Sequence, residues 1–180
     1  MRILVAHASK YGATEAIAER IAERLREAGH EAEARPVEEV GDTAGYGAFV
    51  IGSAVYFGKW LAEAARFVRR HRAELADGRP VWLFSTGPLE APETVAAEAG
   101  EGQDVLADAA PEEIPEFTEL LRARGHRVFF GALDPDALGL RDRLVRALPV
   151  GRPLLPEGDF RVWPDIDDWA AGIARELARA

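Results

Sequence analysis

Short apolar runs alternate with amphipathic segments along the chain. The runs at residues 2–6, 48–53, 80–85 and 128–133 are almost continuously apolar, which is typical of strands buried on both faces of a parallel sheet. Residues 31–37 instead alternate polar and apolar side chains, which predicts an edge strand. Five strands are therefore expected.

Between these runs, apolar residues recur every three or four positions, which predicts helices. The clearest stripe joins Ile17, Ile21 and Leu25, and Gly29 just beyond it is a residue type that often ends helices. The helices predicted in this way span residues 13–28, 59–75, 112–124, 138–148 and 165–178.

This order of elements predicts a single α/β domain over residues 1–180. Parallel strands must be joined by crossovers, which are usually helices, so we expect a doubly wound sheet with helices on both faces. Residues 138–163 are an extra segment beyond the regular alternation. Residues 90–111 are rich in Ala, Glu, Gly and Pro, and we interpret them as a surface loop or a lid.

Composition narrows the classes of function. The chain has 180 residues and a net charge of −9, which argues against nucleic-acid binding because phosphate backbones need basic surfaces. It contains no cysteine, which excludes disulfides, thiolate metal sites and cysteine nucleophiles. Neither a signal-peptide pattern nor an apolar run of membrane-spanning length is found, so we expect a soluble cytoplasmic protein.

Three predicted strands end in loops of unusual chemistry, and a parallel sheet brings all three to one edge. The first loop, SKYGAT, leads into a helix whose free N–H groups favour an anion. The hydroxyls of Ser9 and Thr14 and the absence of a side chain at Gly12 suit a phosphate. Lys10 either adds positive charge or points to solvent. The alternative is simple helix capping by Ser9 or Thr14.

The second loop, SAVYFGKW, gathers aromatic side chains after a buried strand. Tyr56, Phe57 and Trp60 would suit a planar ring attached to the phosphate, although Trp60 could equally pack in the core. The third loop, STGPLEAPE, offers hydroxyl and backbone donors to a ring edge, and Pro88 and Leu89 could cover a ring face. An ordinary Gly-Pro turn is the alternative for that loop.

The order and character of these loops resemble the flavodoxin-like FMN proteins. Residues 9–14 are similar to the phosphate-loop pattern S/T-x-T-G-x-T, except that Tyr11 stands in place of Thr. More narrowly, GSAVYFGKW, FFGALDPDALGLRDRLVRAL and the ending FRVWPDIDDWAAGIARELA resemble the menaquinone-dependent protoporphyrinogen dehydrogenase branch. The similarity covers nearly the whole chain.

The resemblance implies a five-stranded parallel sheet in the order 2-1-3-4-5, with non-covalent FMN at its carboxyl edge. It assigns the phosphate to the first loop and the isoalloxazine ring to the other two. The cofactor-binding residues expected on this basis are Ser9, Lys10, Tyr11, Gly12, Ala13, Thr14, Ala54, Val55, Tyr56, Phe57, Gly58, Trp60, Ser85, Thr86, Gly87, Pro88 and Leu89.

The resemblance also implies an FMN-dependent oxidoreductase that oxidises a porphyrinogen-type substrate and passes electrons to a quinone. One alternative is an electron carrier that docks to a redox partner protein, which the negative charge suits. Another is a binding or signalling module that kept the fold and lost the flavin. A receiver domain is disfavoured, because the first strand ends in Ala6, His7 and Ala8 rather than in paired acids.

No catalytic side chain can be named from the sequence, and none is required, because a flavin carries the redox chemistry itself. His7 is the only histidine near the predicted site. His30 and His126 each follow a glycine that ends a predicted helix, so both are expected at the surface. Acidic residues lack metal-ligand spacing, and no metal site is predicted.

Residues 138–152 combine an apolar stripe with basic residues. Leu140, Leu144 and Leu148 form the stripe, and we expect them to pack on the domain. The alternative is weak peripheral contact with a membrane, or with an anionic substrate, through a basic amphipathic helix. The arginines of this segment are Arg141, Arg143, Arg146 and Arg152.

Overall fold

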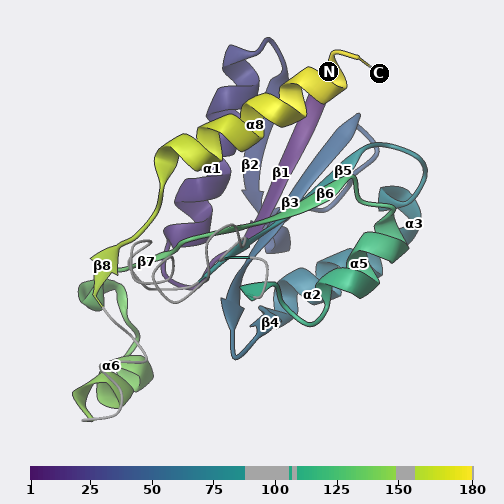
Figure 1. Ribbon diagram of the computed structural model, residues 1–180. Helices are drawn as coiled ribbons and strands as arrows, with labels where there is room; N and C mark the ends of the chain where they lie inside the picture. The colour runs from purple at the N-terminus through teal and green to yellow at the C-terminus, as the bar shows by residue number, and fades with distance from the viewer. Residues whose placement is uncertain (88–105, 107–108, 149–156, 180) are drawn as a thin grey trace.

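A parallel sheet forms the centre of the protein, seen here in a computed structural model that describes residues 1–87, 106, 109–148 and 157–179 (Figure 1). Its order is β2-β1-β3-β5-β6, and all four pairings between these strands are parallel. The strands are β1 (Arg2–Ala8), β2 (Glu31–Pro36), β3 (Ala48–Tyr56), β5 (Val81–Thr86) and β6 (Gly125–Phe129). Counted by these five strands the order is 2-1-3-4-5, so the predicted topology is confirmed.

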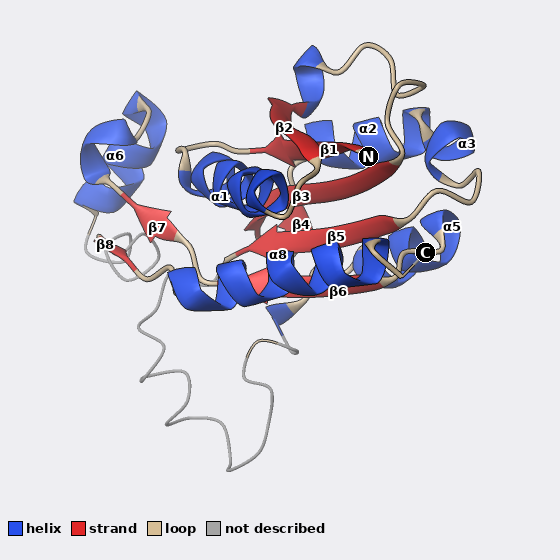
Figure 2. Cartoon of the chain, turned by 90° about the horizontal axis from the view of Figure 1, so that it is seen from above, coloured by secondary structure: helices blue, strands red, loops and turns tan. Residues whose placement is uncertain are grey.

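Helices cover both faces of this sheet (Figure 2). On one face lie α1 (Ala13–Glu27) and α8 (Trp163–Leu177), which pack on Val5, Val50 and Phe84. On the other face lie α2 (Ala62–Arg70), α3 (Arg72–Leu75) and α5 (Ile114–Leu121). In the part of the chain that the structure describes, the other helical elements are η1 (Val37–Glu39), η3 (Pro135–Ala137) and α6 (Leu140–Ala147). This is the doubly wound arrangement that the alternating pattern predicts.

The helix predicted over residues 59–75 is wrong at its start, because a tight hairpin occupies the first of these residues. Phe57 and Gly58 both adopt positive φ, of 51° and 73°, which is the requirement of a type I′ two-residue turn. The chain therefore folds back, and β4 (Lys59–Trp60) pairs antiparallel with the end of β3. Helix begins only at Ala62, and it is interrupted at His71 between α2 and α3.

The strand predicted over residues 128–133 is also wrong in extent. β6 begins earlier, at Gly125, and ends at Phe129, while β7 (Ala132–Leu133) pairs with β8 (Gly158–Asp159) in a separate two-stranded sheet. Gly125 belongs to the strand because α5 already ends at Leu121, where Arg122 takes a left-handed conformation (φ 51°). The stretch predicted as a loop or lid, residues 90–111, falls largely outside the described residues.

Close packing inside β3 leaves no room for a side chain at Gly52. A Cβ built on Gly52 would lie 2.1 Å from two ring atoms of Phe84, its neighbour in β5. That ring is held in turn by Phe129 and Trp169, with centroids 6.2 Å away in each case. The backbone of β3 therefore serves as the surface on which Phe84 packs.

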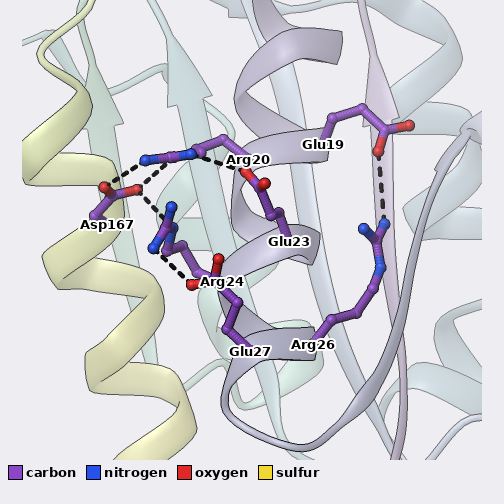
Figure 3. A network of polar contacts seen from close by, with 7 residues as sticks. All are labelled: Glu19, Arg20, Glu23, Arg24, Arg26, Glu27 and Asp167. Atoms are coloured by element: carbon purple, nitrogen blue, oxygen red, sulfur yellow. Dashed lines mark hydrogen bonds and ion pairs between the residues drawn. The ribbon is translucent and has the colours of Figure 1, made fainter.

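A network of ion pairs joins α1 to α8 on the outer side of the sheet (Figure 3). Arg20 binds both carboxylate oxygens of Asp167, at 2.7 and 2.8 Å, and Arg24 Nε lies 3.3 Å from the same carboxylate. The hydrogen bonds from Arg20 hold the pKa of Asp167 below its ordinary value. This network holds α8 against α1, the helix that follows the first loop.

Candidate functional site

The first loop turns sharply at Gly12 to begin α1. Gly12 has φ +86°, a left-handed conformation that other residues rarely adopt, and its carbonyl accepts the first hydrogen bond of the helix from Ala16 N at 2.9 Å. Ser9 Oγ accepts a hydrogen bond from the Gly12 N–H at 3.1 Å, but Gly12 is itself the residue that precedes the helix, so Ser9 does not cap α1. Thr14 makes no capping hydrogen bond. The first turn of α1, which starts at Ala13, therefore presents N–H groups at the carboxyl edge.

Buried polar atoms without partners gather at this edge. Five such side-chain atoms occur among the described residues, and three of them are His7 Nδ1, Thr14 Oγ1 and Thr86 Oγ1. His7 and Thr86 lie at the ends of β1 and β5, on the face of the sheet that α1 and α8 cover. An unpartnered buried hydroxyl is costly, so Thr14 and Thr86 are suited to receive a polar ligand. Burial also lowers the pKa of His7.

A carboxylate from far along the chain contacts the first loop. Lys10 Nζ lies 2.6 Å from Asp142 Oδ2, and the Tyr11 hydroxyl donates to the same oxygen. Lys10 therefore does not simply point to solvent, and the Tyr11 hydroxyl is directed to α6. Sequence reasoning missed Asp142 as a partner, because only the fold brings residues 131 positions apart together.

The hairpin of the second loop carries two aromatic rings at the edge. Tyr56 is partly buried, and burial raises its pKa to about 12, so its phenol stays neutral. Lys10 Nζ lies 4.9 Å from the centroid of the Tyr56 ring, which joins the first and second loops. Phe57, beside Gly58 in the turn, is 98% exposed. Within this hairpin, these two side chains are the aromatic groups available to a planar ligand.

Trp60 packs in the core and belongs to a buried polar chain. Its Nε1 donates to Ser85 Oγ at 2.8 Å, its ring lies 5.4 Å from that of Phe117, and Ser85 Oγ is 2.8 Å from His126 Nε2. An indole can only donate, so Ser85 accepts from Trp60 and can donate its own hydrogen to His126. The alternative that Trp60 packs in the core is therefore confirmed. The hydroxyl of Ser85 has its hydrogen-bond partners inside the protein.

The expectation that His126 lies at the surface is wrong, because this residue is half-buried in β6. Desolvation lowers its pKa from 6.5 to about 4, so it is neutral at physiological pH. His30 is also half-buried, and burial lowers its pKa.

The second and third loops meet side by side. Ala54 in β3 lies opposite Thr86 in β5, and a Cβ built on Gly87 would lie 3.4 Å from Val55 Cβ. The Gly87 N–H donates to Phe129 O at 3.0 Å, which ties the start of the third loop to β6. Pro88 and Leu89 lie outside the described residues.

The donor set of this edge fits a phosphate carried by an aromatic ligand. Free N–H groups of α1, two unpartnered hydroxyls and one ammonium suit an anion, and Tyr56 and Phe57 lie alongside. Within the described residues, no group of three or more His, Asp or Glu could hold a metal ion. Across the same residues, no helix has the length and apolar character needed to cross a membrane.

Comparison with known proteins agrees with this geometry. Residues 4–148 match the family model of the flavodoxin domain. The fold is similar to a flavodoxin from the domain Archaea, with a TM-score of 0.62 and 16% identity over 99% of both chains. A flavodoxin mutant from Pseudomonas aeruginosa gives a TM-score of 0.60, with 16% identity and 99% coverage of both chains. No curated protein sequence matches significantly.

The same fold also occurs within a longer protein. Rubredoxin oxygen:oxidoreductase from the anaerobe Desulfovibrio gigas matches with a TM-score of 0.62 and 12% identity, over 99% of this chain and 36% of that one. At these identities the structures establish the fold alone, whereas the family model covers most of the sequence. The chain belongs to the flavodoxin family.

Proposed function

We propose that this protein binds FMN non-covalently at the carboxyl edge of its sheet and acts as an FMN-dependent oxidoreductase. The observation that carries the proposal is the pair of buried, unpartnered hydroxyls of Thr14, which follows the left-handed turn at Gly12, and of Thr86, at the carboxyl end of β5. The apo protein gains nothing from burying these groups unsatisfied, and polar groups of a bound ligand, with its phosphate at Thr14, would satisfy them.

Each part of the edge has a distinct task in this proposal. Thr14 and the N–H groups of the first turn of α1 hold the phosphate, with Lys10 adding positive charge that Asp142 partly offsets. Tyr56, Phe57 and the backbone of the third loop flank the ring. Bound FMN supplies one- and two-electron redox chemistry, and the protein supplies orientation and electrostatics.

The finer form of the proposal is two-electron oxidation of a porphyrinogen-type substrate with a quinone as acceptor. It is supported by the resemblance of residues 52–60, 129–148 and 160–178 to the protoporphyrinogen dehydrogenase branch. A second candidate is an electron carrier that docks to a redox partner. It is favoured by the match to flavodoxins over 99% of both chains and by the net charge of −9.

Absorption spectroscopy tests the common core of both candidates. The apo protein is titrated with FMN and with riboflavin, and FMN should bind far more tightly because only FMN carries the phosphate. Equal affinities, or no binding of either compound, would contradict the proposed site. For a protein that binds FMN, anaerobic incubation with protoporphyrinogen and a quinone separates the candidates: porphyrin formation identifies the enzyme, and its absence leaves the carrier.

A further inference from the structure

Exposed apolar side chains are concentrated at one edge of the molecule. Among the described residues, five large apolar side chains are exposed, and one of them, Met1, lies at the amino edge. The other four lie at the carboxyl edge, and they are Phe57 (98% exposed), Leu140 (83%), Leu144 (71%) and Leu148 (55%). The expectation that the three leucines pack on the domain is therefore wrong, and their exposure needs a partner.

The leucine stripe points away from the protein because the opposite face of α6 is tied to it. With about 100° of rotation per residue, Asp142 lies on roughly the opposite side of the helix from the stripe. Asp142 contacts Lys10 and Tyr11, and Arg143 donates to Asp136 O at 2.6 Å. Figure 1 shows α6 standing off the main body, beside the short strands β7 and β8.

Charge selects the kind of partner. The sequence of α6 contains three arginines and one aspartate, which gives a net charge of +2, whereas the whole protein carries −9. An anionic surface attracts this helix and repels the rest of the molecule, so it fixes one orientation. A stripe of leucines in an arginine-rich helix is typical of helices that lie in the interface of anionic membranes.

We propose that α6 docks on an anionic lipid surface through Leu140, Leu144 and Leu148. Because Asp142 ties α6 to the first loop, docking holds the carboxyl edge of the sheet close to the bilayer, with Phe57 at that same edge. Lipid contact uses exposed side chains only and does not depend on FMN. Its test is therefore independent of the test of the proposed function.

Vesicle flotation with the full chain, with and without FMN, tests the proposal. Vesicles of phosphatidylcholine with about a third phosphatidylglycerol should bind the protein at about 25 mM salt, where charges are weakly screened. Pure phosphatidylcholine vesicles should bind it weakly, and about 500 mM salt should weaken binding to the anionic vesicles. Leu144→Asp should reduce the partition coefficient by more than about tenfold, and Leu144→Ala by several-fold.

Ala178→Asp is the matched control. It adds the same charge at an exposed position beyond the end of α8, on the opposite edge of the sheet, and it should leave partitioning within about twofold. Circular dichroism and thermal melts establish that each variant is folded. Absence of wild-type binding at low salt, or equal losses in Leu144→Asp and Ala178→Asp, would overturn the proposal. A dimer that Leu144→Asp abolishes, without vesicle binding, would assign the stripe to a second copy of the chain instead.

Discussion

Replacing Thr14 with Val removes one hydroxyl and almost no volume, so it isolates the role of that group. Thr14 is 1% exposed and its Oγ1 has no partner. In the apo protein the substitution should therefore leave the free energy of unfolding unchanged or raise it by about 1 kcal/mol, because an unsatisfied buried hydroxyl disappears. At most buried threonines the hydroxyl is hydrogen-bonded, so the same substitution would lower the free energy of unfolding.

FMN binding should respond in the other direction. A hydrogen bond to a charged group contributes about 1.5–3 kcal/mol, so loss of the Thr14 contact to the phosphate should weaken FMN binding roughly 10- to 150-fold. Riboflavin lacks the phosphate, and its affinity should not change. Quenching of flavin fluorescence in titrations of apo protein measures both constants, and urea denaturation measures stability.

Thr43→Val is the matched control. Thr43 is also 1% exposed with an unpartnered hydroxyl, but it lies before β3, at the amino edge of the sheet. It should show the same small gain in stability and no change in FMN affinity. If Thr14→Val binds FMN as tightly as the wild type, or loses FMN and riboflavin affinity equally, the phosphate does not reach Thr14.

Three further substitutions probe the surroundings of the site. His126→Gln should reduce the pH dependence of the free energy of unfolding between pH 6.5 and 4. The unfolded chain protonates His126 near pH 6.5, whereas the folded protein protonates it only near its pKa of about 4. The free energy of unfolding of the wild type therefore falls by up to about 3 kcal/mol across that window as pH falls. Unchanged urea profiles at several pH values would contradict this. Asp142→Asn should raise FMN affinity up to about fivefold at low salt by leaving Lys10 uncompensated, whereas a fall would show that this contact positions the loop. Gly52→Ala should destabilise by about 3 kcal/mol because Phe84 cannot move aside, while Gly41→Ala, with no atom within 4 Å, should be nearly neutral in the same urea experiment.

The sheet can be predicted from sequence because a strand buried on both faces has a local signature. The apolar runs locate β1, β3 and β5 to within three residues at each end, and the loops after them follow from parallel topology. The hairpin at Phe57 and Gly58 escapes prediction because the residues after it look helical. Only the positive φ of two successive residues reveals the turn.

Partners brought together by the fold cannot be predicted in the same way. Nothing local distinguishes Asp142 from other acids, and its contact with Lys10 depends on the path of the chain through β7 and η3. The sequence misplaces His126 for a related reason. The helix before it ends early, which moves the histidine from an expected surface turn into a strand.

The adjacent hydroxyls of Ser85 and Thr86 show how the fold divides neighbours that the sequence treats alike. Side chains of a strand alternate between faces, so Ser85 points toward α2 and α5, where Trp60 and His126 satisfy it. Thr86 points toward α1 and α8, where it stays unpartnered, and Thr14 in the first turn of α1 is likewise unpartnered. Ser85 is therefore a structural residue that holds the edge together, and Thr86 is available to a ligand. Because the unsatisfied polar atoms of β1, α1 and β5 belong to this same side, it is the side on which we expect the polar end of the proposed ligand, near the amino end of α1.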